Sequence, residues 1–244
     1  MRSAKEIRVA PIEAAVSNRL MRRLHYSGSV VPNSQLHFGV FLDGRLQGAM
    51  QFGPSMAKKQ MVGLVRGTAW NGFLELNRMA FSEVLPRNSE SRAIGVAFRL
   101  IRKHYPQIKW VLSFADGTQC GDGTIYRASG FELIGIKKNT SLLRMPDGSV
   151  MARMSLDHLL GGMNSGQWKR KGATPLKGFQ LKYIKFVDQS WRPRLGVPVL
   201  PFSAIAEAGA TMYKGNKCAG SETSDTPGDQ PGEGGAIPTP ALHE

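Results

Sequence analysis

The feature that most constrains the fold is a short apolar run, Trp110 to Ala115, which follows an amphipathic segment ending at Pro106. The run has the length of a strand and so few polar side chains that we expect both of its faces to be buried. Residues 91–105 place apolar side chains on one side at helical spacing and basic side chains mostly on the other, and the proline ends this helix. Because a further strand is expected over residues 74–81, the sequence predicts a strand–helix–strand crossover in the middle of a sheet.

Other strands are expected on both sides of this crossover. Residues 36–42 and 45–52 flank Asp43-Gly44, a dipeptide typical of two-residue hairpins. The remaining expected elements are strands at 7–9 and 131–136, helices at 11–24 and 124–129, and a hairpin of 141–145 with 149–154. This order predicts an α+β protein with a mixed, mostly antiparallel twisted sheet flanked by helices.

Charge is distributed unevenly along the chain. The formal net charge is +14, and residues 219–244 hold five acidic side chains and no Lys or Arg, which leaves +19 on residues 1–218. Fourteen Lys or Arg stand against four acids between Lys137 and Lys217, and aromatic residues are interleaved with them. Basic residues interleaved with aromatic ones are typical of nucleic-acid contact, although a solvated basic face explains the composition equally well.

These patterns predict three segments: a sheet domain over residues 1–157, a basic, aromatic-containing extension over 158–218 that contacts DNA, and an acidic disordered tail over 219–244. No apolar stretch reaches the roughly 18 to 20 residues that span a bilayer, so we expect no membrane partner. The chain start lacks the apolar core of a signal peptide, and its two cysteines form no Cys-x-x-Cys pair. Both features favour a reducing cytoplasm.

A candidate phosphate site lies where the strand at 74–81 leads into the crossover helix. Small residues at a helix start expose backbone N–H groups that suit a pyrophosphate, but an ordinary capped helix start explains them as well. An arginine on the preceding strand could hold a phosphate or pair with Glu75. The candidate residues for cofactor binding are Arg78, Ser91, Arg92 and Gly95.

Tyr126 stands one helical turn before Gly130-Phe131, near the end of the buried strand. A phenol at that place could donate a proton to a leaving group. A half-buried tyrosine with a hydrated hydroxyl is the structural alternative.

The order of elements, the segment 88–95 and the Tyr-x-x-x-Gly-Phe pattern together resemble the GCN5-related N-acetyltransferase (GNAT) fold over roughly residues 5–155. That family binds the coenzyme A pyrophosphate with Gln/Arg-x-x-Gly-x-Gly/Ala, and the matching positions here are Asn88, Ser91 and Ala93. The resemblance implies a GNAT-like transferase domain over residues 1–157. It also implies acetyl-CoA or another acyl or glycyl donor.

His25-Tyr26-Ser27-Gly28, Ala115-Asp116-Gly117-Thr118 and Tyr126 resemble the Mom family of phage DNA-modification proteins. This resemblance implies a DNA adenine N6-modifying transferase that converts adenine in phage DNA to N6-carbamoylmethyladenine (acetamidoadenine). The modified base protects the DNA from host restriction endonucleases in the host cytoplasm. An iron-dependent step is implied as well.

The chemistry of this reaction assigns roles to the same residues. Adenine N6 is a poor nucleophile because its lone pair is delocalised into the ring, so a base is needed, and His25 and Asp116 are the candidates. Double-stranded DNA hides this amine, so the adenine should be flipped out against aromatic walls. Candidates for these walls are Tyr26, Trp70 and Phe114. The carbamoylmethyl group is attached through carbon, so simple acetyl transfer from a thioester would give a different product.

Iron would accept the imidazole, phenol and carboxylate of His25, Tyr26 and Asp116. The three lack a familiar metal-ligand spacing, and a histidine at a helix end is more often a cap. With Tyr126 they form the expected catalytic set. Two other functions stay open: an acyl-CoA-dependent N-acetyltransferase of protein or RNA amines, and a non-catalytic DNA-binding anti-restriction protein. A monomer and a homodimer are both compatible with the sequence.

Overall fold

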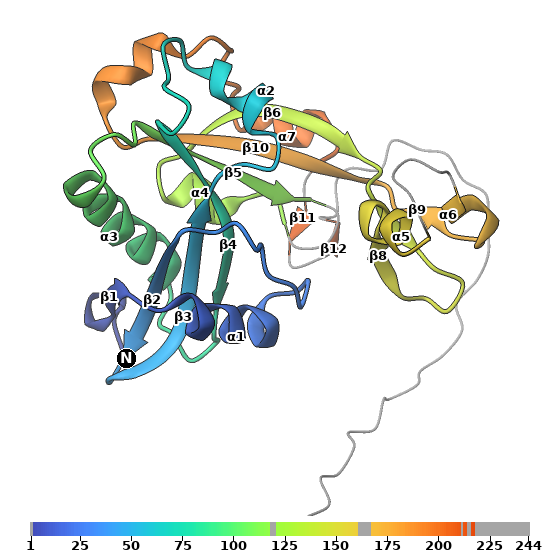
Figure 1. Cartoon of the computed structure of the whole chain (residues 1–244), viewed down its shortest axis with the longest axis horizontal. Coiled ribbons are helices and arrows are strands. Elements are labelled where there is room, and N and C mark those ends of the chain that lie inside the picture. Colours follow the sequence, from blue (N-terminus) through green and yellow to red (C-terminus); the bar gives the residue numbers. More distant parts are fainter. Residues whose placement is uncertain (1, 118–120, 161–166, 211, 214–215, 218–244) are drawn as a thin grey trace, which may run out of the picture.

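A seven-stranded sheet forms the centre of the computed structural model, which describes residues 2–117, 121–160, 167–210, 212–213 and 216–217 (Figure 1). In spatial order its strands are β1 (Arg8–Pro11), β2 (Leu36–Leu42), β3 (Arg45–Gly53), β4 (Phe73–Phe81), β5 (Trp110–Asp116), β10 (Gly178–Phe186) and β6 (Glu132–Asn139). Every neighbouring pair is antiparallel except β4 and β5, which are parallel. The predicted α+β class with a mixed, mostly antiparallel sheet is confirmed.

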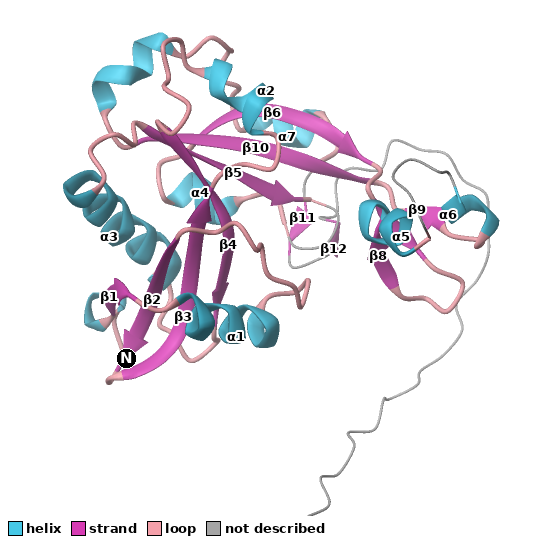
Figure 2. Ribbon diagram, viewed as in Figure 1, coloured by secondary structure: helices cyan, strands magenta, loops and turns pink. Residues whose placement is uncertain are grey.

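Helices cover both faces of this sheet (Figure 2). Side chains alternate between the two faces of a strand, so Ala49 packs with α1 while the adjacent Met50 belongs to the core under α3. We call these the α1 face and the α3 face. The helical segments are η1 (Ala4–Glu6), α1 (Ala14–Leu24), α2 (Lys58–Met61), η2 (Val62–Leu64), α3 (Ser89–His104), α4 (Thr124–Ala128), η3 (Gln189–Arg194) and α7 (Ser203–Glu207).

The predicted crossover is confirmed as β4–α3–β5. Helix α3 follows Asn88, whose φ of 69° turns the chain away from β4, and it ends before Pro106. It buries an apolar stripe against the sheet, formed by Ala93, Ile94, Ala97, Phe98 and Ile101. Strand β5 is buried from Trp110 through Ser113, as the near-continuous apolar run predicts.

The two predicted hairpins are also confirmed. Asp43 and Gly44 have φ values of 50° and 74°, which suit the primed turns of two-residue hairpins. The second hairpin pairs β7 (Leu142–Arg144) with β8 (Val150–Ala152). The helix expected from residue 11 begins only at Ala14, because Pro11 is the last residue of the edge strand β1, where its missing N–H is tolerated.

Residues 178–186, which the sequence pattern places in the basic extension over 158–218, belong to the main sheet instead. These residues form β10, which lies between β5 and β6, so the sheet continues well past residue 157. Leu181, Tyr183, Ile184 and Phe186 of this strand are buried, and the partly buried Lys182 and Lys185 stand among them. The acidic tail, 219–244, lies outside the described residues.

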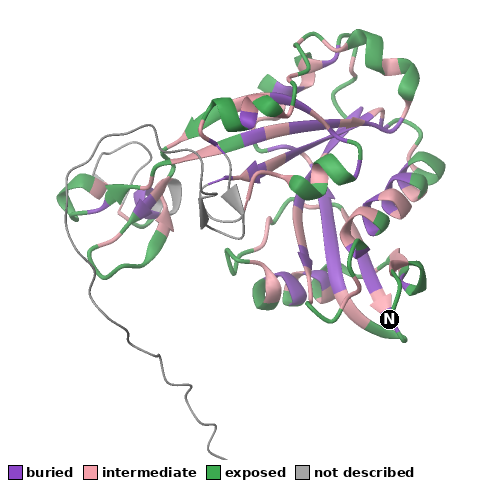
Figure 3. Cartoon of the chain, turned by 180° about the vertical axis from the view of Figure 1, so that it is seen from behind, coloured by how far each residue is buried: buried purple, intermediate pink, exposed green. Residues whose placement is uncertain are grey.

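Residues 140–177 leave the sheet between β6 and β10 and form what we call the projecting module (Figures 1 and 3). It contains the small sheet β8–β7–β9, with β9 at Thr174–Pro175, and the helices α5 (Arg153–Leu159) and α6 (Gln167–Arg170). It has its own small core of Leu143, Leu156 and Ala173. A short hairpin of β11 (Met212–Tyr213) and β12 (Asn216–Lys217) follows later in the chain. In the described part of the chain, no helix is long and apolar enough to cross a membrane.

Candidate active site

The sheet opens between β4 and β5. These strands pair only from Phe73 to Glu75 with Trp110 to Leu112, and beyond that point β4 continues beside β3 while β5 continues beside β10. Asn77 is an extra residue in β4, because Gln51 pairs with Arg78 and Phe52 pairs with Leu76. Such bulges redirect side chains near functional sites. The parallel strands therefore leave an opening between their carboxyl ends.

A cavity of about 410 Å³ lies at this opening. Its size falls in the range of small-molecule sites. It is lined by residues from the end of α1, from β4, from β5 and from the loop that begins α4: His25, Tyr26, Leu76, Asn77, Arg78, Met79, Phe114, Ala115, Asp116, Gly121, Asp122, Gly123, Thr124, Ile125 and Tyr126. All four predicted catalytic residues are in this lining, as is Arg78 from the predicted cofactor set.

His25 is placed by α1. The buried Gln51 of β3 donates hydrogen bonds to Ser17 Oγ at 2.9 Å and Asn18 Oδ1 at 2.8 Å, which fix α1 on the sheet. The Nδ1 atom of His25 lies 2.8 Å from Ser27 Oγ, so chemistry in the cavity is left to Nε2. Burial, and secondly the charge of Arg78, lowers the pKa of His25 to about 4. The imidazole is therefore neutral at neutral pH. The backbone N–H of Ser27 donates to Nδ1 at 3.2 Å, which favours the tautomer with its proton on Nε2, and Nε2 accepts a proton or binds a metal only in the other tautomer, whose Nδ1–H donates to Ser27 Oγ.

Arg78 brings a positive charge to the cavity. Its Nη1 donates to the carbonyl oxygen of Asn77 at 2.8 Å, while its Nε is buried and has no hydrogen-bond partner in the described part of the chain. Burial raises the pKa of Glu75, and Arg78 is among the weaker influences that oppose this shift. A buried donor without a partner is costly, so this guanidinium is suited to an anionic group of a bound molecule.

Asp116 and Tyr126 approach the cavity from its other side. Asp116 ends β5 and lies opposite Gln180 of β10. The ring of Tyr126 lies 5.3 Å from the ring of Phe131 and 5.3 Å from that of Tyr183. The Gly-Phe pair after α4 thus supports Tyr126 through Phe131, in agreement with the pattern seen in the sequence.

Sequence reasoning missed the residue that supports this part of the cavity wall, Tyr183 of β10. Its hydroxyl donates to the carbonyl oxygen of Asp122 at 2.5 Å, and burial raises its pKa, so the phenol stays protonated as a donor. Gly123 has a φ of 81°, and a Cβ at this glycine would lie 2.5 Å from Tyr183 Cε2. The run Gly121-Asp122-Gly123 was a usable signal, because glycines beside a site often permit close contact. Nothing in the local sequence indicated Tyr183 as the contact.

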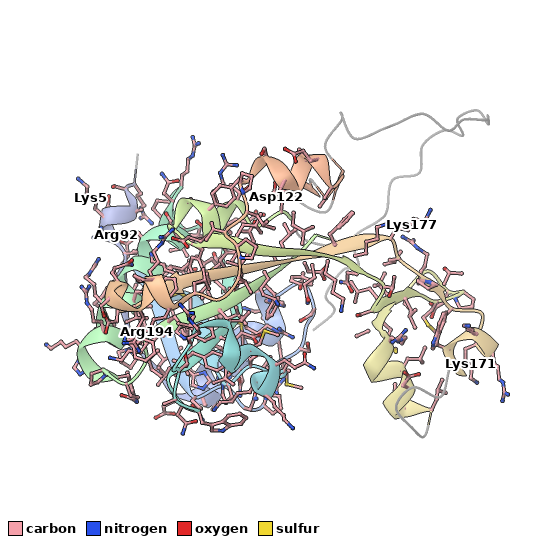
Figure 4. The ribbon with its side chains drawn as sticks, turned by 90° about the horizontal axis from the view of Figure 1, so that it is seen from above. Lys5, Arg92, Asp122, Lys171, Lys177 and Arg194 are labelled. Atoms are coloured by element: carbon pink, nitrogen blue, oxygen red, sulfur yellow. The ribbon has the colours of Figure 1, made fainter. Side chains whose placement is uncertain are left out.

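Ser91, Arg92 and Gly95 do not line this cavity. Ser91 Oγ donates to the carbonyl oxygen of Asn88 at 3.2 Å, which is a local helix-end contact. Arg92 directs Nη2 toward the carbonyl oxygen of Lys5, 3.4 Å away, and Figure 4 places both residues well away from Asp122. Among the expected aromatic walls, Tyr26 and Phe114 line the cavity, whereas Trp70 is 56% exposed and lies under Lys58 instead.

The donor types of His25, Tyr26 and Asp116 fit an iron ion, because a neutral imidazole, a phenol and a carboxylate are all accepted iron ligands. The three side chains line one cavity although they come from two distant segments. Across the described residues, no cluster of three or more His, Cys, Asp or Glu could hold a metal, so the tyrosine is needed to complete this set.

Comparison with known proteins places the chain in context. Residues 6–204 match the model of the Mom protein family. The methylcarbamoylase Mom of Escherichia phage Mu is 37% identical over 196 residues, which is 79% of this chain and 80% of that protein. Similar solved structures include the ribosomal-protein-S18-alanine N-acetyltransferase of Escherichia coli, with 9% identity, a TM-score of 0.43, and 75% and 94% of the two chains covered. An IAA acetyltransferase from Bacillus cereus gives 10% identity, a TM-score of 0.43, and 74% and 99% coverage.

Proposed function

Because the chain belongs to the Mom protein family, we propose that it is a DNA-modifying transferase that converts adenine to N6-carbamoylmethyladenine. In phage DNA this change would protect against host restriction endonucleases in the host cytoplasm. The phage Mu relative is named a methylcarbamoylase, which indicates transfer of a group of the same composition as the proposed carbamoylmethyl group. The observation that carries the proposal is the convergence of His25, Tyr26, Arg78, Asp116 and Tyr126 on one cavity.

The cavity supplies what the poorly nucleophilic adenine N6 needs. Asp116 or the neutral His25 accepts a proton from N6 as the new bond forms. Tyr26 is 54% exposed and its ring lies 4.3 Å from that of His25, so it offers a stacking surface where the base enters. Phe114 provides an apolar wall further in. A base that reaches this cavity must leave the duplex stack, so we propose that the adenine is flipped out.

Arg78 and Tyr126 serve the donor side of the reaction. The Arg78 guanidinium neutralises an anionic part of the donor, and the Tyr126 phenol returns a proton to the leaving group. Since N6 becomes bonded to a methylene carbon, the donor must present that carbon rather than a thioester carbonyl. Acyl transfer from acetyl-CoA does not satisfy this requirement, so we favour a two-carbon donor, such as a glycine-derived one, in which the bond between the methylene carbon and its leaving group breaks as the bond to N6 forms.

Iron fits the same cavity, held by His25, Tyr26 and Asp116. When bound, it supplies Lewis-acid polarisation of a donor oxygen. The neutral state of His25, produced mainly by its burial, keeps the imidazole in the form that binds metals.

DNA contact is assigned to the basic residues beyond the cavity. The projecting module carries exposed Lys169, Arg170, Lys171 and Lys177, and it begins where β6 and β10 leave the sheet. Cations of this kind neutralise backbone phosphates without regard to sequence, which suits an enzyme that modifies adenines in many places. Double-stranded DNA is therefore the proposed substrate, and a homodimer is not required by the site.

The test is nucleoside mass spectrometry of DNA from cells that express the protein. We expect N6-carbamoylmethyladenine with the wild type and its loss with Asp116→Ala, while affinity for duplex DNA is retained. Asp147→Ala, in an exposed turn of the projecting module, is the matched control and should retain the product. Labelled glycine or acetate in the medium would identify the donor in the same run. Unmodified adenine with the wild type would contradict the proposal, and N-acetylated protein or RNA would favour an ordinary acetyltransferase.

A further inference from the structure

Two lysines lie on the α1 face of the sheet immediately beside the cavity. Lys182 of β10 is paired with Phe114 of β5, which lines the cavity. Lys137 of β6 is paired with Gln180, which in turn is paired with Asp116. Side chains alternate between the two faces of a strand, and Lys182 lies on the same face of β10 as Ile184. Ile184 packs in the core under η2 and η3, which is on the α1 face. Lys137 lies on this face too, because its partner Gln180 is two residues from Lys182 along β10. Neighbouring strands are about 5 Å apart, so both lysines start within about 10 Å of the cavity wall.

The two ammonium groups repel each other, and neither forms an ion pair with any residue that the structure describes. Burial, and secondly the charge of Lys137, lowers the pKa of Lys182, which is half-buried while Lys137 is exposed. Within the described ranges, the ion pairs are elsewhere: Arg2 with Asp43, Lys109 with Asp188, and Arg192 with Glu132. Two like charges on diagonal positions of a sheet destabilise it. An anion that binds between the two lysines offsets this repulsion.

We infer that Lys137 and Lys182 bind the DNA phosphates that flank the target adenine. This inference rests on the proposed function. When a base rotates out of the duplex, its own sugar and the neighbouring phosphates stay outside the cavity that receives it. The rim of the cavity must therefore face negative charge. On the β5 side, that rim is the strand pair that carries these two lysines.

The positive surface continues from these lysines onto the projecting module. Asn139 is paired with Gly178, and the chain between them is the module itself, so Lys137 lies two residues before its first connection. Lys171 and Lys177 lie on this module, at the opposite end of the molecule from Lys5 and Arg92 (Figure 4). A duplex held by the module would thus pass next to the Lys137–Lys182 pair before it reaches the cavity.

The test is the salt dependence of binding to a duplex oligonucleotide, measured by fluorescence anisotropy with the full chain. Each phosphate contact contributes about 0.9 to the slope of log K against log salt concentration. We expect the double variant Lys137→Gln/Lys182→Gln to lower this slope by about 1 to 2 and to weaken binding several-fold at low salt. Lys182→Arg should keep the wild-type slope.

Lys138→Gln is the matched control. This exposed neighbour of Lys137 is paired with Phe179, which packs against the core of the α3 face, so its charge points to the other side of the sheet. A slope in the double variant equal to that of the wild type would overturn the inference, as would an equal loss in Lys138→Gln. Modified adenine in DNA from wild-type cells is scored separately. Its absence would reject the proposed function even if the slope falls, whereas its presence with an unchanged slope would reject only the lysine pair.

Discussion

The cavity and the projecting module are built in opposite ways. The cavity depends on contacts between residues far apart in the chain, since His25, Arg78 and Asp116 come from three separate elements held by the cores on the two faces of the main sheet. The module depends on a core of three buried residues under a mostly exposed basic surface. Substitutions in the cavity should therefore affect chemistry, whereas damage to the module should affect DNA affinity.

Among the variants that test this contrast, the one that truncates the central side chain of the module's core should have the largest effect. Leu143 is fully buried, and Leu143→Ala should cost about 2 to 5 kcal/mol, as large-to-small core substitutions do. A core this small cannot absorb such a loss, so we expect rapid proteolysis within residues 140–177 and weaker duplex binding, with little change in the denaturant midpoint of the main sheet. Val150→Ala, at a position 40% exposed in β8, should leave both unchanged. Global unfolding of the Leu143 variant would show that the two regions are one cooperative unit.

Most of the main sheet could be predicted from sequence, because its elements carry local signals. The Asp43-Gly44 turn, the apolar run of β5 and the helix stopped by Pro106 each specify their own structure. Strand β10 could not be placed, because its position between β5 and β6 is set by pairing with residues that are 39 or more positions away in sequence, as Gly178 is from Asn139. Its lysines belong to the two faces of the sheet rather than to a loop: Lys182 points to the α1 face and Lys185 to the α3 face, where its ammonium lies over the Phe98 ring.

The candidate site could be predicted only in part, because local sequence signals mark some of its residues and not others. His25, Tyr26, Asp116 and Tyr126 stand in short motifs that resemble a known family, and all of them line the cavity. Ser91, Arg92 and Gly95 were chosen from a helix start, and they do not line it. Tyr183 carries no local motif, and only the assembled sheet brings it against Gly123.

Gly123→Ala tests whether the cavity depends on that close contact. A left-handed φ costs a non-glycine residue about 1 to 2 kcal/mol, and overpacking against Tyr183 adds about 1 to 3 kcal/mol. We therefore expect a loss of about 2 to 5 kcal/mol in denaturant unfolding, and a severe loss of modified adenine in cells.

Gly130→Ala is the control that separates these two causes. Gly130 has a similar φ of 74°, but its nearest neighbour is Lys185 Nζ, 3.8 Å from an added Cβ. It should lose only the backbone contribution and keep the product. Equal losses in the two variants would mean that the contact with Tyr183 has no role in the cavity.

The smallest expected effect, Tyr183→Phe, separates positioning from stability. The ring stays in place, while the carbonyl oxygen of Asp122 loses its donor, at a cost of about 1 kcal/mol. If this hydrogen bond holds the cavity wall beside Tyr126, product formation should fall several-fold in protein that remains folded. Thr68→Val is the control, because it removes both the acceptor of the buried Trp110 indole, 3.0 Å away, and the donor to the carbonyl oxygen of Val65, 2.6 Å away, and none of these residues lines the cavity. Thr68→Val should lose at least as much stability by denaturant unfolding as Tyr183→Phe, yet only Tyr183→Phe should lose product, because only its hydrogen bond fixes the wall against which the base reacts.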